Sequence, residues 1–132
     1  MPVFGAIGIA ATGATTYRKW LDAVSDNISN MNDAVSTSSS AFQERFVIAQ
    51  PASDGNGVQV GGIQLGSATG RVVNEPGNPL ADKDGNVRYP DIDLGEQMGQ
   101  LIMAQRGYQA NLSVVDRAKD AYQAALQLGR NS

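Results

Sequence analysis

The chain of 132 residues contains neither cysteine nor histidine. The missing cysteines exclude a disulfide framework and a thiol nucleophile, and the absence of both residue types excludes zinc sites with Cys or His ligands. A catalytic triad built on histidine is excluded as well. The sequence therefore lacks the side chains of several common catalytic and metal-binding designs, and we expect no cofactor and no small-molecule substrate.

Positive charge is scarce, and the net charge of the chain is −3. Lys and Arg form no cluster, whereas binding to a phosphate backbone needs one, so no nucleic-acid partner is expected. The glycines from Gly55 to Gly62 lack the lysine and the following helix of a phosphate-binding loop. The composition therefore excludes nucleotide chemistry of that kind.

The chain also lacks a long hydrophobic run. The apolar stretch 3–16 is too short and too rich in Gly and Ala for a membrane span. The first basic residue is Arg18, beyond that stretch, whereas a secretory signal begins with a basic segment. If the protein leaves the cytosol, we expect export without a cleaved signal peptide.

What the sequence does have is a long heptad pattern at its C-terminal end. Apolar residues recur at alternating steps of four and three, interrupted by Gln105 and Lys119: Leu94, Met98, Leu101, Tyr108, Leu112, Val115, Tyr122 and Leu126. This spacing predicts one helix of roughly 50 Å over residues 93–130. Asp93 and Glu96 are typical of a helix start, and Gly129 is typical of a left-handed C-cap.

A second heptad pattern occupies the N-terminal end, and none of its members is charged: Ile7, Ala10, Ala14, Tyr17, Leu21, Val24, Ile28 and Met31. Gly5, Gly8 and Gly13 each weaken a helix by about 1 kcal/mol relative to Ala. We therefore expect a firm helix only from around Thr12 or Thr15 onward, reaching Met31.

The two patterns have similar lengths, which favours an antiparallel coiled-coil pair that brings the chain ends together. The predicted fold is mainly α: residues 1–32 and 93–132 form long terminal helices, and residues 33–92 form a linker with a small irregular β and loop region. Each pattern is alternatively the buried face of an ordinary bundle, but the sequence offers no third strong helix. We expect the helices to be stable only when they pack on neighbouring subunits.

The middle of the chain has short strand and turn patterns. Segment 33–41 is rich in serine, has no periodicity and is predicted to be a mobile linker. Extended segments are predicted at 42–48, 58–65, 71–73 and 87–89, with a bulge at Gly61 and Gly62. Turns are predicted at 51–57 and 76–79.

The acidic segment that starts at Asp82 superficially resembles a calcium-binding loop. An EF-hand loop starting there needs Gly at its sixth position and Glu at its twelfth, where this chain has Val87 and Asp93. The better interpretation is a turn in which Gly85 adopts a positive φ after Asp84, followed by an extended segment.

Pairs of acidic residues, such as Asp91 with Asp93 or Glu75 with Asp84, have the residue types of a glycosidase acid and base. They are better explained as loop residues, a helix cap and solvated charge. No active site is expected, and the chain is predicted not to be an enzyme.

Asparagines gather at the end of the N-terminal heptads, at Asn27, Asn30 and Asn32. One or two of them can cap a helix, since an amide can donate to the free carbonyls of the last turn. Three in six residues exceed what one cap needs. A second amide pair, Gln109 and Asn111, lies on the C-terminal helix, where a polar side chain at the edge of a seam can fix the register between helices.

Taken in order, these motifs resemble the axial proteins of the bacterial flagellum, and most closely the small proximal-rod members of that family. The matching segments cover nearly the whole chain: Asn27-Ile28 with Asn30 and Asn32, Gly57-Val58-Gln59-Val60, Pro76-Gly77-Asn78-Pro79, Asp84-Gly85-Asn86-Val87-Arg88-Tyr89-Pro90 and Tyr108-Gln109-Ala110-Asn111. Asp33-Ala34 and Phe42-Gln43-Glu44-Arg45 depart from it, at positions where the family has a threonine and an aromatic and basic segment.

The resemblance implies a structural subunit of the periplasmic basal-body rod, which polymerises by its terminal helices into the torque-transmitting shaft around the export channel. Implied partners are proximal and distal rod proteins, inner-membrane ring and export-gate proteins, surrounding rings and further copies of the chain. The residues expected at the assembly interface are Tyr17, Leu21, Val24, Asn27, Ile28, Asn30, Met31, Asn32, Leu101, Tyr108, Asn111, Leu112, Val115 and Tyr122. A soluble coiled-coil adaptor of an export apparatus and a peptidoglycan hydrolase are the alternatives.

Overall fold

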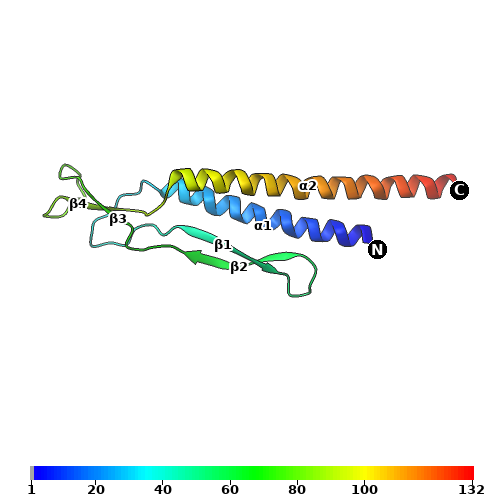
Figure 1. Cartoon of the computed structure of the whole chain (residues 1–132), viewed down its shortest axis with the longest axis horizontal. Coiled ribbons are helices and arrows are strands. Elements are labelled where there is room, and N and C mark those ends of the chain that lie inside the picture. The colour runs from blue at the N-terminus through cyan, green and yellow to red at the C-terminus, as the bar shows by residue number, and fades with distance from the viewer. Residues whose placement is uncertain (1) are drawn as a thin grey trace.

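Two long antiparallel helices dominate the computed structural model, which describes residues 2–132 (Figure 1). Helix α1 spans Pro2–Asn30, and helix α2 spans Leu94–Asn131. Two small antiparallel hairpins connect them, and the first lies along α1 on the side away from α2 (Figure 1). The fold is therefore mainly α with a small β middle region, as the sequence predicts.

The start of α2 confirms the predicted cap. Asp93 has extended backbone, with φ −94°, and its carboxylate oxygen accepts a hydrogen bond of 2.7 Å from the backbone N–H of Glu96. The predicted C-cap is wrong, because the helix continues through Gly129 to Asn131 and Gly129 has no positive φ. The Ser132 hydroxyl donates to the Gly129 carbonyl at 3.1 Å. It therefore satisfies one of the carbonyls of the last helical turn, which a left-handed C-cap would otherwise satisfy through backbone hydrogen bonds.

The start of α1 differs from the prediction as well. The helix begins at Pro2, about ten residues earlier than the glycine content suggested. Proline suits the first helical turn because its φ is already close to the helical value. The Phe4 ring packs against Tyr122 of α2 with 5.0 Å between ring centroids, and Ala10 is buried. Packing on α2 thus offsets the low helix propensity of the glycines.

The two hairpins agree broadly with the predicted strands. Strands β1 (Arg45–Pro51) and β2 (Val58–Leu65) pair in antiparallel register, with an irregularity that leaves Gly61 without a partner, at the predicted bulge. Strands β3 (Arg71–Asn74) and β4 (Asn86–Tyr89) form the second hairpin. The Gly85 turn is confirmed, since Gly85 has φ +80° and its N–H donates to Asp82 O at 2.9 Å.

Segment 33–41 is hydrogen-bonded to the second hairpin, whereas the sequence predicted a mobile linker. Val35 and Arg88 exchange two backbone hydrogen bonds of 2.8 and 2.9 Å, and Ala41 N donates to Ala68 O at 2.9 Å. The Thr37 hydroxyl donates to the Asp82 carboxylate at 2.8 Å. Of the serines and threonines that indicated a linker, Thr37 therefore helps to hold this segment on β4 and its preceding loop, since its carbonyl also accepts a hydrogen bond of 2.8 Å from the Arg88 guanidinium.

Within residues 2–132, no helix is long and apolar enough to cross a membrane, and no cluster of three or more acidic side chains is arranged to hold a metal ion. The Asp82 carboxylate accepts backbone N–H groups of Asp84 and Asn86, each at 2.9 Å. The N–H of Asn86, with further help from the Thr37 hydroxyl, holds the pKa of Asp82 below its ordinary value of 3.8. The Asp82 carboxylate therefore stabilises this turn by accepting its backbone N–H groups.

Candidate assembly interface

The face of α2 that packs on α1 follows a heptad spacing. Apart from Gln100 and Gly107, the buried and half-buried residues of α2 recur at steps of four and three: Gln97, Leu101, Ala104, Tyr108, Asn111, Val115, Ala118 and Tyr122. Every second member belongs to the seam predicted from the sequence, and the others are amides or alanines. The larger apolar residues predicted between them are exposed: Leu94, Met98, Leu112 and Leu126.

Two glycines allow the helices to approach closely. A β-carbon on Gly13 would lie 2.5 Å from the Asn111 side-chain oxygen, and one on Gly107 would lie 2.4 Å from the Tyr17 ring. Each glycine therefore receives a side chain from the opposite helix. From the sequence, Gly13 is expected only to weaken its helix and Gly107 has no predicted role. A glycine inside an otherwise strong helix is nevertheless a signal of close approach.

Amide side chains fix the register between the helices. The Trp20 indole N–H donates to Gln100 Oε1 at 3.2 Å. Near the end of α1, Asn27 Nδ2 donates to Gln97 Oε1 at 3.0 Å, and both side chains are completely buried. Sliding the helices by one turn would separate these partners and leave buried polar groups unpaired, which costs about 1–3 kcal/mol for each group.

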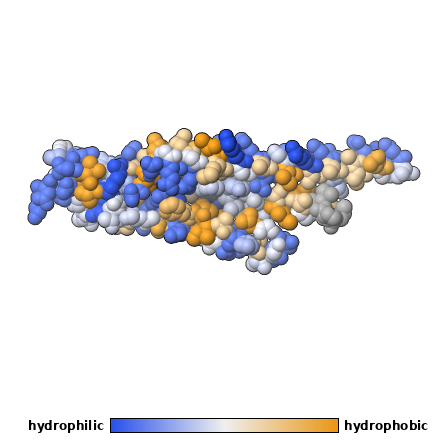
Figure 2. Space-filling model, in the orientation of Figure 1, coloured by the Kyte–Doolittle hydropathy of each residue, from blue (hydrophilic) through white to orange (hydrophobic). Residues whose placement is uncertain are grey.

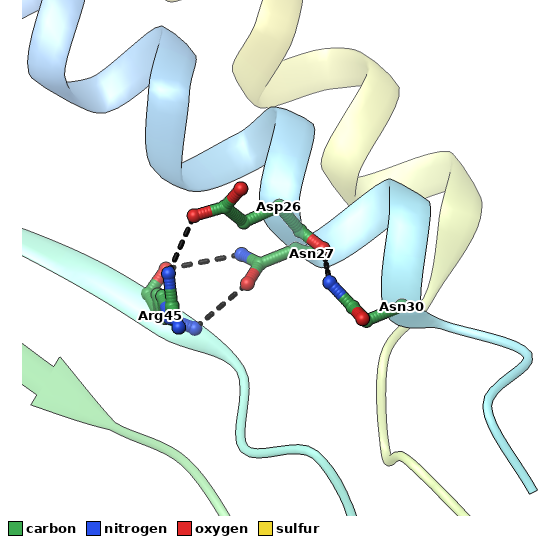
Figure 3. A network of polar contacts seen from close by, with 4 residues as sticks. All are labelled: Asp26, Asn27, Asn30 and Arg45. Carbon is green, nitrogen blue, oxygen red and sulfur yellow. Dashed lines mark hydrogen bonds and ion pairs between the residues drawn. The ribbon is translucent and has the colours of Figure 1, made fainter.

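Asn27 also binds the first hairpin to the helices (Figure 3). Its Oδ1 accepts from Arg45 N at 2.8 Å and its Nδ2 donates to Arg45 O at 3.0 Å, so the amide pairs with Arg45 as a neighbouring strand would. The Arg45 guanidinium forms an ion pair of 2.5 Å with Asp26. One asparagine thus joins α1, α2 and β1.

Asn30 has the simpler role of capping the helix end (Figure 3). Its Nδ2 donates to the Asp26 carbonyl at 2.8 Å, in the last turn of α1. Asn32 is exposed just beyond the helix. The asparagine cluster therefore combines a helix cap at Asn30 with a contact between elements at Asn27, and both interpretations of the sequence apply to part of it.

A carboxyl group completes the polar network at the start of α2. Gln97 Nε2 donates to Glu44 Oε1. Burial raises the pKa of Glu44 above its ordinary value of 4.5, the hydrogen bond from Gln97 opposes the rise, and the nearby charges of Glu96 and Asp91 add to it. Gln97 and Glu44 were not among the predicted site residues, because nothing in the local sequence pairs them.

The tip of the first hairpin rests on α1. Val58 N donates to the Thr12 hydroxyl at 3.1 Å, and the positive φ of Gly57, +107°, brings the backbone against that side chain. Between tip and base, the helix and the hairpin line a half-open apolar pocket of about 270 Å³. It is lined by Gly13, Thr16, Tyr17, Trp20, Val47, Ala49 and Val58.

The remaining predicted interface residues occupy varied environments. Val24 is completely buried, whereas Leu21, Ile28, Met31, Leu101, Tyr108 and Val115 are half-buried. Leu112 is exposed. The Phe4–Tyr122 and Tyr17–Gly107 contacts lie inside the chain, so these residues already have a role in the α1–α2 packing. Roles in contacts between chains stay predictions.

Much of the apolar surface has no cover within the chain. Figure 2 shows apolar patches over α2 and on the hairpin side of the molecule. Large exposed apolar side chains occur on α1, β1, β2 and α2: Phe4, Ile9, Ile48, Ile63, Leu65, Leu94, Met98, Ile102, Met103, Leu112, Val114, Leu126 and Leu128. Uncovered apolar faces on an elongated helical pair are typical of a chain that forms part of a larger protein assembly.

Comparisons with known proteins identify the assembly. Residues 83–128 match the family described as flagellar basal body rod FlgEFG protein C-terminal. The chain is 31% identical to the flagellar basal-body rod protein FlgC of Yersinia enterocolitica, over 98% of this chain and 100% of that protein. The FlgC proteins of Borreliella burgdorferi and Bacillus subtilis are 27% and 25% identical, over at least 97% of both chains. The chain belongs to the flagellar basal-body rod protein family.

Proposed function

We propose that this chain is a structural subunit of the bacterial flagellar basal-body rod and contributes to motility by assembly, without catalysis. The observation that carries the proposal is the uncovered apolar surface of both helices. Residues 2–17 of α1 contain no charged side chain, and Phe4 and Ile9 are about half exposed. A helix stretch without charge is typical of a buried position. Helix α2 covers one side of α1 and the first hairpin lies along another, but Phe4 and Ile9 in the first turns stay uncovered.

In this proposal the two terminal helices pack as an antiparallel coiled-coil pair and continue that packing with neighbouring subunits. Contacts between unlike surfaces that do not close on themselves generate a helical array, which suits a torque-transmitting shaft around an export channel. The middle hairpins face adjacent subunits and rings. Proximal and distal rod proteins, the inner-membrane ring and the export gate are the proposed neighbours, in the periplasmic part of the basal body.

The test places charges on α2 at Leu112, which is exposed, and at Val115, which is half-buried on the face that packs on α1. Replacing Leu112 and Val115 with Asp should abolish rod assembly while the chain is still synthesised, because two carboxylates in an apolar interface would lose their hydration. Basal bodies are purified and imaged by electron microscopy. Ser113→Asp is the matched control, because Ser113 is exposed and lies between the two positions. Intact rods and normal motility in the double variant would exclude this role for the seam.

A further inference from the structure

The loop between β1 and β2 contains the only Asn-Gly pair of the sequence, Asn56-Gly57. The Asn56 side chain is exposed, and its amide Nδ2 donates to the Asp54 carbonyl at 3.3 Å. Within residues 2–132, the Gly57 N–H has no hydrogen-bond acceptor. Figure 1 shows this loop projecting from the side of the molecule away from α2. A solvated side-chain amide therefore stands beside a backbone nitrogen that no hydrogen bond restrains.

This arrangement favours closure of a cyclic imide. The deprotonated backbone nitrogen after an asparagine attacks the Cγ of that asparagine, the N–Cγ bond forms, and the Cγ–Nδ2 bond breaks as ammonia leaves. Glycine supplies the least hindered nitrogen, because it has no β-carbon. Asparagine is accordingly among the thermally labile residues of proteins. Water then opens the imide at either of its two carbonyls, which leaves aspartate or isoaspartate.

Other sites in the middle of the chain are protected against the same reaction. The N–H of Gly55, in the same loop, donates to a carbonyl at 2.9 Å. The N–H groups that follow Asn32 and Asn74 donate to carbonyls at 3.1 and 2.7 Å. Asn78 is followed by a proline, which has no N–H. A bonded nitrogen has to give up its hydrogen bond before it can attack, so the reaction is expected at Asn56.

The residues next to this pair hold the tip of the first hairpin on α1. A β-carbon on Gly57 would lie 2.2 Å from the Thr12 hydroxyl oxygen, so the Gly57 backbone packs directly on that side chain. Val58 N donates to the same hydroxyl at 3.1 Å, and the hydroxyl donates to the Ile9 carbonyl at 2.6 Å. A change in the length of the main chain at Asn56 therefore acts on this contact.

We propose that Asn56-Gly57 is a site of spontaneous deamidation, and that its isoaspartate product releases the tip of the first hairpin from Thr12. Isoaspartate routes the main chain through the Cβ and Cγ of residue 56, which lengthens it by a methylene. It also places a second carboxylate near that of Asp54. The loss of ammonia is irreversible, so the modified fraction grows with the age of the chain. The inference goes beyond the proposed rod function and is independent of it, because the reaction needs only the single chain and water.

Peptide mass spectrometry of the aged chain tests the modification. The native full-length chain is incubated at neutral and at mildly alkaline pH, and each asparagine is followed for the mass increase that replaces NH₂ by OH. Asn56 should convert severalfold faster than Asn32 and Asn74, and faster at alkaline pH, because the nucleophile is the deprotonated nitrogen. Two products of equal mass should separate by chromatography. Asn56→Gln should resist conversion, since its longer side chain has to close a larger ring.

Two outcomes of that experiment would overturn the modification site. One is conversion of Asn56 no faster than that of Asn32 and Asn74. The other is conversion of Asn56 only after unfolding in urea, because the native loop would then protect the amide.

Trp20 reports whether the hairpin tip is released. It is the only tryptophan, and it lines the pocket between α1 and the first hairpin together with Val58. The purified isoaspartate form should show a red-shifted Trp20 emission and faster hydrogen exchange at Val58 N–H than the fresh chain. Asn56→Gln aged in parallel should show neither change.

Asn56→Asp is the matched control for charge, because it adds the carboxylate without lengthening the main chain. It should change the Trp20 emission and the Val58 exchange much less than isoaspartate does. Equal changes in Asn56→Asp would overturn the role of the lengthened main chain. Unchanged emission and exchange in the isoaspartate form would overturn the release of the tip.

Discussion

The ring of Tyr17 occupies the space where a side chain on Gly107 would begin. Three ring atoms lie within 2.7 Å of the position of a β-carbon on that glycine. The Tyr17 ring also stacks on Trp20, with 6.0 Å between centroids, and Trp20 in turn donates to Gln100. The absence of a side chain at Gly107 of α2 therefore determines how Tyr17 and Trp20 of α1 pack against that helix.

Gly107→Ala should destabilise the chain by about 1–2 kcal/mol, although alanine is the better helix former, because the Tyr17 ring has to move. Urea or thermal unfolding followed by circular dichroism measures the loss. Gly99→Ala is the matched control on the same helix and should have the opposite sign, since it meets open space. Equal effects of the two substitutions would contradict the close-approach explanation.

Asn27→Ala should cost about 2–4 kcal/mol, because the buried Gln97 amide and the part-buried backbone N–H and C=O of Arg45 all lose their partner. Asn30→Ala removes one hydrogen bond near the helix end and should cost about 1 kcal/mol. Unfolding of the two variants under identical conditions makes the comparison. If Asn27→Ala cost no more than Asn30→Ala, the role of Asn27 in joining α1, α2 and β1 would be wrong.

Glu44 should make the chain less stable as the pH rises. Its pKa is raised from 4.5, so between that value and the folded-state pKa the native chain binds more protons than the unfolded chain. The free energy of unfolding therefore falls with increasing pH in that window. Glu44→Gln should remove this slope and leave Gln97 with an acceptor, and Glu96→Gln should reduce it. If the free energy of unfolding of Glu44→Gln still falls with pH in this window, another titratable group causes the fall.

Asp82 should act in the opposite direction. Its pKa is lowered, first by the N–H of Asn86, so its contribution to stability is present above 3.8 and is lost as the pH falls through the folded-state pKa. Asp82→Ala should release segment 33–41, because the Thr37 hydroxyl and the turn lose their acceptor. Hydrogen exchange at Val35 N–H should then accelerate, while Gln97 N–H in α2 should be unaffected. Unchanged protection of Val35 would mean that its backbone pairing with Arg88 suffices.

The boundaries of α2 illustrate how far local sequence signals reach. Asp93 is a cap in the structure because its carboxylate needs only the N–H of Glu96, three residues away. The turn at Gly85 and the bulge at Gly61 were predictable for the same reason, since each depends on a few neighbouring residues. The early start of α1 was not predictable, because contacts with Tyr122, more than a hundred residues away, outweigh its glycines.

By itself, the sequence determined the two long helices, their heptad period, the hairpin turns and, through its motifs, the flagellar family. These follow from local spacing and from residue types that a fold of this kind requires. Only the tertiary structure decided which side of each helix turns inward. A heptad pattern restricts the buried face of a helix only to a broad apolar strip. Contacts of glycines and amides decide which residues of α2 within that strip face α1: Gln97 lies opposite Asn27, and Asn111 lies opposite Gly13. That choice left the larger apolar residues outside, because close packing at glycine and alanine excludes them.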